Sequence, residues 1–191
     1  YNTLSATKAA AVTTAANANQ LTIAGGTFKE TVFGGKTSAT NDDATGTATA
    51  TARGNELWAN GGTFQRNVLA GWGNATTKAG TATTTASENK LHLAGAATFP
   101  TGGATVYITG GNASVRSETG KLSLTMEKNS IDGTLTSAQS VVCGADGKLD
   151  QLAAAGGQAI TASAAENTVT LTGGKAYQVD GSRLTLSRAS G

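Results

Sequence analysis

An internal repeat is the feature that most constrains what this chain folds into. In four segments an Asn is followed two residues later by Leu or Val and six residues later by Gly, and an aromatic residue comes soon after the Gly. The Asn residues are Asn19, Asn55, Asn89 and Asn167, the Gly residues Gly25, Gly61, Gly95 and Gly173, and the aromatic residues Phe28, Phe64, Phe99 and Tyr177. The Asn residues are separated by 36 (19 to 55), 34 (55 to 89) and 78 (89 to 167) positions, and 78 is two units of 39. The chain therefore holds about five units of roughly 35 residues, the size of a structural repeat.

Each unit predicts three short strands. Leu21-Thr-Ile23 alternates with period 2 and ends at Gly-Gly, the second half-unit reads Val32-Phe-Gly-Gly35, and residues 47–52, after Gly46, alternate Thr with Ala. Strands separated by glycine corners make one coil of a solenoid whose neighbouring coils bury its apolar face. We therefore predict an all-β chain forming a right-handed parallel β-helix or solenoid. A β-sandwich-like filament subunit is the alternative fold. The unit exceeds a minimal three-sided coil, so we expect residues 36–44 to protrude as a loop.

The chain divides into two parts by its repeat frame. Residues 1–16 lack the frame and predict an N-terminal cap or edge segment, and residues 17–191 are the repetitive solenoid. The frame is degenerate over 126–165, where the helix-forming run 146–155 indicates a short helix or a loop. The predicted core consists of the inward strand positions: Leu21, Ile23, Phe28, Val32, Leu57, Phe64, Val68, Leu91, Leu93, Phe99, Val106, Ile108, Leu122, Leu124, Val169, Leu171, Tyr177, Val179, Leu184 and Leu186.

The recurring positions predict structure rather than ligand binding. Asn at one position of successive coils favours an amide ladder inside the turn, and the recurring aromatic residues favour a stack in the core. Trp58 and Trp72 are the candidate exposed contact residues, because Trp is enriched at binding surfaces. His92 lies between two Leu on a strand and should point outward, and Cys143 follows two Val and should be buried.

Composition excludes several function classes. One His and one Cys provide neither a paired metal ligand set nor a catalytic dyad, so we predict no catalytic residues, metal or cofactor. A net charge of +2 without a Lys/Arg cluster does not favour nucleic acid. No apolar stretch approaches the roughly 18 residues that a membrane-spanning helix needs. The 12 carboxylates are scattered, which disfavours a polysaccharide-acting β-helix enzyme.

Units of the form Asn-x-(Leu/Val)-x-(Ile/Leu)-x-Gly-Gly-x-Phe, followed by Val-x-Gly-Gly, resemble the passenger-domain repeats of bacterial autotransporter adhesins. The resemblance covers roughly residues 17 to 175 and is weakest over 112–165. It implies a right-handed β-helix displayed at the bacterial cell surface or secreted, with a protein or glycan of a host or bacterial surface as ligand. The first hypothesis is therefore a non-enzymatic adhesin or display scaffold. The alternative is a structural subunit that associates end to end into an extracellular filament.

Overall fold

The chain forms a stack of coils in which every strand pairs in parallel with the equivalent strand of the next coil. The computed structural model describes all residues except 104, 137–138, 153–158 and 189–191. Its described residues are strands, turns and connections, without a helix. The prediction of an all-β parallel solenoid is therefore confirmed. The sandwich alternative is wrong, because its antiparallel hairpins have no counterpart in these parallel ladders.

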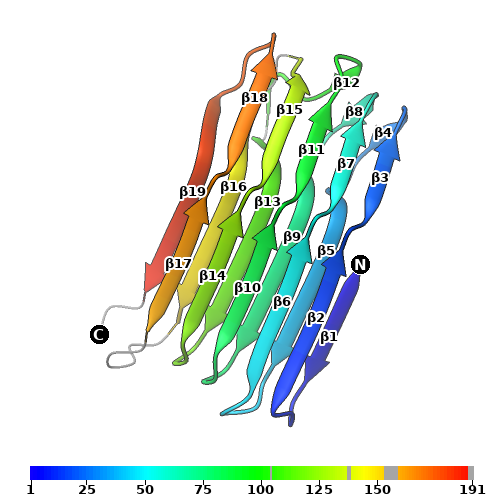
Figure 1. Cartoon of the computed structure of the whole chain (residues 1–191). Helices are drawn as coiled ribbons and strands as arrows, with labels where there is room; N and C mark the ends of the chain where they lie inside the picture. Colours follow the sequence, from blue (N-terminus) through cyan, green and yellow to red (C-terminus); the bar gives the residue numbers. More distant parts are fainter. Residues whose placement is uncertain (104, 137–138, 153–158, 189–191) are drawn as a thin grey trace.

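Four sheets run along the stack (Figure 1). The β9 sheet contains β1 (Asn2–Ala6), β5 (Val32–Asn41), β9 (Val68–Thr77), β13 (Val106–Ser117), β16 (Ser140–Gln151) and β19 (Gln178–Arg188). The β6 sheet contains β2 (Ala11–Asn17), β6 (Thr47–Arg53), β10 (Ala82–Ser87), β14 (Leu122–Glu127) and β17 (Ile160–Ala165). The β7 sheet contains β3 (Gln20–Ile23), β7 (Glu56–Ala59), β11 (Lys90–Leu93), β15 (Ser130–Thr134) and β18 (Thr168–Thr172). The β8 sheet contains β4 (Thr27–Phe28), β8 (Gly62–Phe64) and β12 (Ala97–Thr98).

The coil is flattened into two layers. Figure 1 shows the β6 and β7 sheets following one another along one line in front of the long strands of the β9 sheet. Alternate residues of β5 beyond Gly35 are buried, as are alternate residues of β6, so these two strands pack face to face. Two apolar clusters fill the space between the layers, one beneath the β7 sheet and one beneath the β6 sheet.

Two local predictions are wrong. Residues 36–41 are the second half of β5 rather than a protruding loop, so the length of the unit goes into long strands. The run from Asp146 to Gln151 lies in β16 rather than in a helix, and residues 153–155 are outside the described part. In β16 the charged residues Asp146, Lys148 and Asp150 alternate with the buried residues 147, 149 and 151. This alternation of two residues is that of a strand, and β16 pairs with β13 along its length. Strand pairing therefore outweighs the helix propensity of the segment.

The two ends of the stack are edges. β1 and β2, in the predicted N-terminal edge segment, are the outermost strands of their sheets. At the other end, four residues of the predicted core are instead exposed: Tyr177, Val179, Leu184 and Leu186. β19 is the last strand of its sheet and packs against β17 and β18 on one side only, whereas β5 packs against both β2 and β6. The remaining predicted core residues are buried in, or packed against, the two clusters.

Candidate functional site

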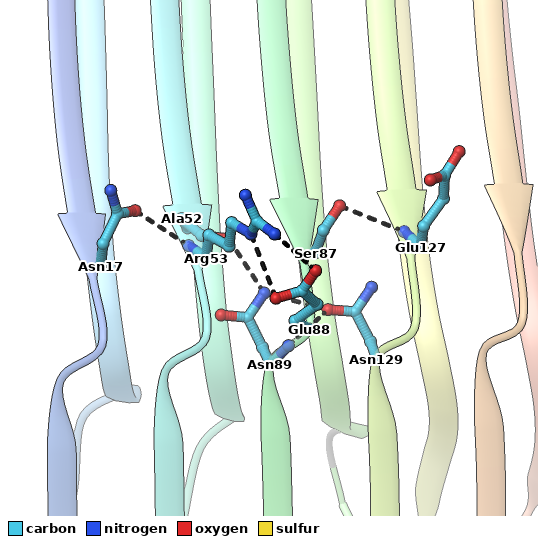
Figure 2. Close-up of polar contacts among 8 residues, drawn as sticks. All are labelled: Asn17, Ala52, Arg53, Ser87, Glu88, Asn89, Glu127 and Asn129. Atoms are coloured by element: carbon cyan, nitrogen blue, oxygen red, sulfur yellow. Dashed lines mark hydrogen bonds and ion pairs between the residues drawn. The ribbon is translucent and has the colours of Figure 1, made fainter.

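An asparagine ladder runs through the stack where the β6 sheet meets the β7 sheet. Each Nδ2 donates to the Oδ1 of the next Asn, over distances of 2.7–2.9 Å. The same Oδ1 also accepts the backbone N–H of the preceding Asn. Figure 2 shows Asn89 facing Asn129 across neighbouring coils. The ladder comprises Asn19, Asn55, Asn89, Asn129 and Asn167.

Two backbone features hold the ladder in place. The residue before each ladder Asn has a positive φ of 53–63°, which turns the chain at the junction of the two sheets, and only one of these five residues is Gly: Ala18, Gly54, Glu88, Lys128 and Glu166. Opposite the ladder, a Cβ on Gly71 would lie 2.3 Å from Cγ of Asn89. Gly35 and Gly111 face Asn55 and Asn129 at similarly short distances. The second Gly of the Val-x-Gly-Gly motif therefore makes room for the ladder amide.

The aromatic positions form a stack at three of the four predicted places. The ring centroids of Phe28 and Phe64 are 5.0 Å apart, and those of Phe64 and Phe99 are 5.4 Å apart. Tyr177 is 74% exposed and does not continue this stack. The ladder and the stack join successive coils inside the solenoid, so a candidate contact surface has to lie on the outer faces.

The repeat Gly positions lie at the corners that follow the β7-sheet strands. Gly25, Gly61 and Gly95 come after β3, β7 and β11, and Gly173 follows β18. At the corner after β18, Gly173 itself has a positive φ. At the corner after β7, the residue with a positive φ is Gly62, at 109°, and not Gly61. A Cβ on Gly61 would instead lie 2.6 Å from the carbonyl oxygen of Ala24, so close approach of the neighbouring coil is what requires this Gly.

Trp58 and His92 meet on the outer face of the β7 sheet. Their rings stack with centroids 5.1 Å apart, and His92 Nδ1 lies 2.8 Å from Asp132 Oδ1. On the other side, His92 Nε2 lies 3.7 Å from Glu56 Oε1, and Lys90 pairs with the same carboxylate at 3.4 Å. The Trp58 ring is therefore packed against a polar row instead of standing free.

A second polar row follows the ends of the β6-sheet strands (Figure 2). Arg53 donates to both carboxylate oxygens of Glu88, at 3.1 and 2.7 Å. This pair lowers the pKa of Glu88 and raises that of Arg53. Ser87 Oγ accepts the backbone N–H of Glu127, which repeats the bond from Arg53 N–H to Asn17 Oδ1 two coils earlier. These contacts tie successive coils together on an exposed edge.

A groove with a volume of about 360 Å³ lies on the outer face of the β9 sheet. One register row supplies four of its residues, which lie on β9, β13, β16 and β19: Trp72, Asn112, Asp146 and Arg183. Arg183 donates to both carboxylate oxygens of Asp146, at 3.0 and 2.7 Å, and this contact raises the pKa of Arg183. The guanidinium carbon also lies 5.1 Å from the ring centroid of Tyr107, which lines the groove.

Trp72 is held at one end of this groove. Lys36 occupies the same register row one coil earlier, and its Nζ lies 4.9 Å from the Trp72 ring, 4.6 Å from Phe33 and 4.7 Å from Tyr1. The Phe33 ring meets Trp72 edge-on, with centroids 6.0 Å apart. The sequence singled out Trp72, but not its companions, because only the register brings them together.

The single thiol of the chain lies in the core. Cys143 is fully buried, and burial raises its pKa to about 11. Within the described part of the chain, no group of three or more His, Cys, Asp or Glu side chains is placed to hold a metal ion. The same residues include no helix long and apolar enough to cross a membrane.

No protein family, no curated protein and no solved structure matches this chain. The groove and the rows around it therefore have to be interpreted from their own chemistry.

Proposed function

We propose that this chain is a non-enzymatic display scaffold of an adhesin, at the bacterial cell surface or secreted. The observation that carries the proposal is the groove between Trp72 and Arg183, where rings and polar side chains from four coils meet on an outer face. Pockets that bind ligands combine apolar surface with a few well-placed polar groups. The likeness of the repeats to autotransporter passenger domains supports the same function. The ligand is a protein or glycan of a host or bacterial surface.

Adhesion of coated beads tests this proposal. Beads carrying the wild-type chain should stay on layers of epithelial or bacterial cells under flow, and beads carrying Trp72→Ala should wash off. Trp58→Ala is the matched control, because Trp58 lies on the opposite layer against His92. Wild-type retention no better than that of albumin-coated beads would overturn the adhesin role. Absorbance of unsaturated products during incubation with acidic polysaccharides would overturn its non-enzymatic part.

The second candidate is a subunit of an extracellular filament, and complementary end faces favour it. Asn19 begins the ladder by donating to Asn55 Oδ1, and Asn167 ends it by accepting from Asn129, while its own Nδ2 donates to Met126 O and Ser182 Oγ. The register rows place Leu4 in line with Leu186, and Leu21 in line with Val169. A copy stacked end to end would continue each row. Sizing at micromolar concentration decides this case, because a chain that stays monomeric is not such a subunit.

A further inference from the structure

We infer that the groove between Trp72 and Arg183 binds a neutral glycan, a chain of uncharged hexose units lying across β9, β13, β16 and β19. This inference rests on the proposed adhesin function and names the ligand class of its site. A sugar ring offers C–H faces that pack on aromatic rings, and hydroxyl groups at its edge that need hydrogen-bond partners. The groove supplies both kinds of surface.

The aromatic surface is fixed before any ligand arrives. Trp72 is restrained by Lys36 and Phe33 of the preceding coil, and the Arg183 guanidinium carbon lies 5.1 Å from the Tyr107 ring centroid and restrains that ring from one side. Both rings line the groove. Rings that are held in place in the free protein lose little conformational freedom on binding, so their contact area favours binding.

The polar surface is also oriented in advance. Arg183 fixes the Asp146 carboxylate, which keeps acceptor capacity for sugar hydroxyl groups. Asn67 accepts the backbone N–H of Tyr107 at 2.9 Å, which fixes its amide beside the ring.

The charges of the groove favour a neutral ligand over a sulfated or carboxylated one. Its two cationic side chains each face a carboxylate at short range: Arg183 contacts Asp146 at 2.7 Å, and Lys148 contacts Asp150 at 2.9 Å. An anionic glycan would have to displace these carboxylates or lie beside them. A neutral chain meets no such repulsion.

Tryptophan fluorescence tests the inference with a panel of linear neutral hexasaccharides of glucose, galactose, mannose or N-acetylglucosamine. The parent protein is Trp58→Phe, so that Trp72 is the reporter. At least one hexasaccharide should give a saturable change with a dissociation constant of about 1 mM or tighter. Tyr107→Ala should weaken binding about ten-fold or more, as truncation of an aromatic contact residue does. Thr49→Ala, on the outer face of the β6 sheet, is the matched control and should bind like the parent.

Three results would overturn the inference, provided that far-UV circular dichroism shows each variant folded. They are no saturable change with any neutral hexasaccharide, a response to sulfated hexasaccharides alone that disappears in high salt, and unchanged affinity in Tyr107→Ala. Beads that adhere without hexasaccharide binding would leave the adhesin proposal standing and refute only the glycan. Hexasaccharide binding without bead adhesion would support the glycan site and refute the adhesin role.

Discussion

Replacing Asn89 by Ala removes one amide from the centre of the ladder. The Asn89 side chain is fully buried and takes part in four hydrogen bonds. Its Nδ2 donates to Ala52 O at 3.0 Å and to Asn129 Oδ1 at 2.9 Å. Its Oδ1 accepts from the backbone N–H of Asn55 at 3.1 Å and from its Nδ2 at 2.8 Å.

The loss can be estimated from the groups that the substitution leaves behind. Asn129 Oδ1 keeps the backbone N–H of residue 89, and Asn55 Nδ2 keeps Ala16 O. The backbone N–H of Asn55 loses its bond to the ladder, and Ala52 O loses the amide donor. A buried polar group left unsatisfied costs about 1–3 kcal/mol, so two such groups lower the free energy of unfolding by about 4 kcal/mol. For a chain of this size the melting temperature should fall by roughly 10 °C, at about 2–4 °C per kcal/mol.

Thermal unfolding followed by far-UV circular dichroism measures this loss. The matched control is Asn19→Ala, which removes the first ladder amide. Asn19 is exposed and donates to Asn55 Oδ1 at 2.7 Å, so water replaces its partners and the cost should be about 1 kcal/mol or less. If the melting temperature falls by the same amount in both variants, burial of the amides does not stabilise the ladder, and the reasoning fails.

Three further predictions concern other parts of the coil. Gly71→Ala should cost about 3 kcal/mol because its Cβ meets the ladder amide 2.3 Å away, whereas Gly25→Ala, with no atom within 4 Å, should be nearly neutral in the same melting assay. Arg53 lowers the pKa of Glu88 from its ordinary 4.5, so this ion pair stabilises the fold above that pH and its contribution is lost as the pH falls through the lowered pKa. The difference in unfolding midpoint between wild type and Glu88→Gln should therefore be present at about pH 6 and should shrink as the pH falls below the ordinary pKa of the carboxyl group. Burial raises the pKa of Cys143 to about 11, so a thiol reagent at about pH 8 should label it only as fast as the chain unfolds, and rapid labelling of folded protein would contradict this.

The parts of the fold that could be predicted are those in which coils repeat the same side chain. A ladder needs Asn at each level and a stack needs an aromatic ring at each level, so both patterns are visible in the sequence as recurrences of Asn55 and Phe64. The fourth ladder residue, Asn129, was missed because the Gly that follows it comes after four residues instead of six. The sequence does contain part of the repeat pattern here, because Ile131 follows Asn129 by two residues, as Leu57 follows Asn55.

Trp72 stands out in the sequence by its residue type, but the groove around it could not be predicted, since the residues of the groove share neither type nor spacing. Trp72, Asn112, Asp146 and Arg183 are separated by 40, 34 and 37 positions, and no two are alike. They lie in one row because each is paired with the next in the β9 sheet. A repeat conserves what the inside of the coil requires, whereas its outer face is free to differ from coil to coil. The repeat pattern therefore does not reveal which residues share a row on the outer face.

The variable length of the units shows where the constraint on register lies. Successive ladder residues are 36, 34, 40 and 38 positions apart, yet each amide bonds to the next at 2.7–2.9 Å. An extra residue inside a strand would turn its inward side chains outward, so length can change only at the corners. More residues separate β12 from β13 than separate β8 from β9, so the extra length falls between strands and not within them. The ladder restores the register after each corner, which keeps the four outer-face residues of the groove in one row across coils of unequal length.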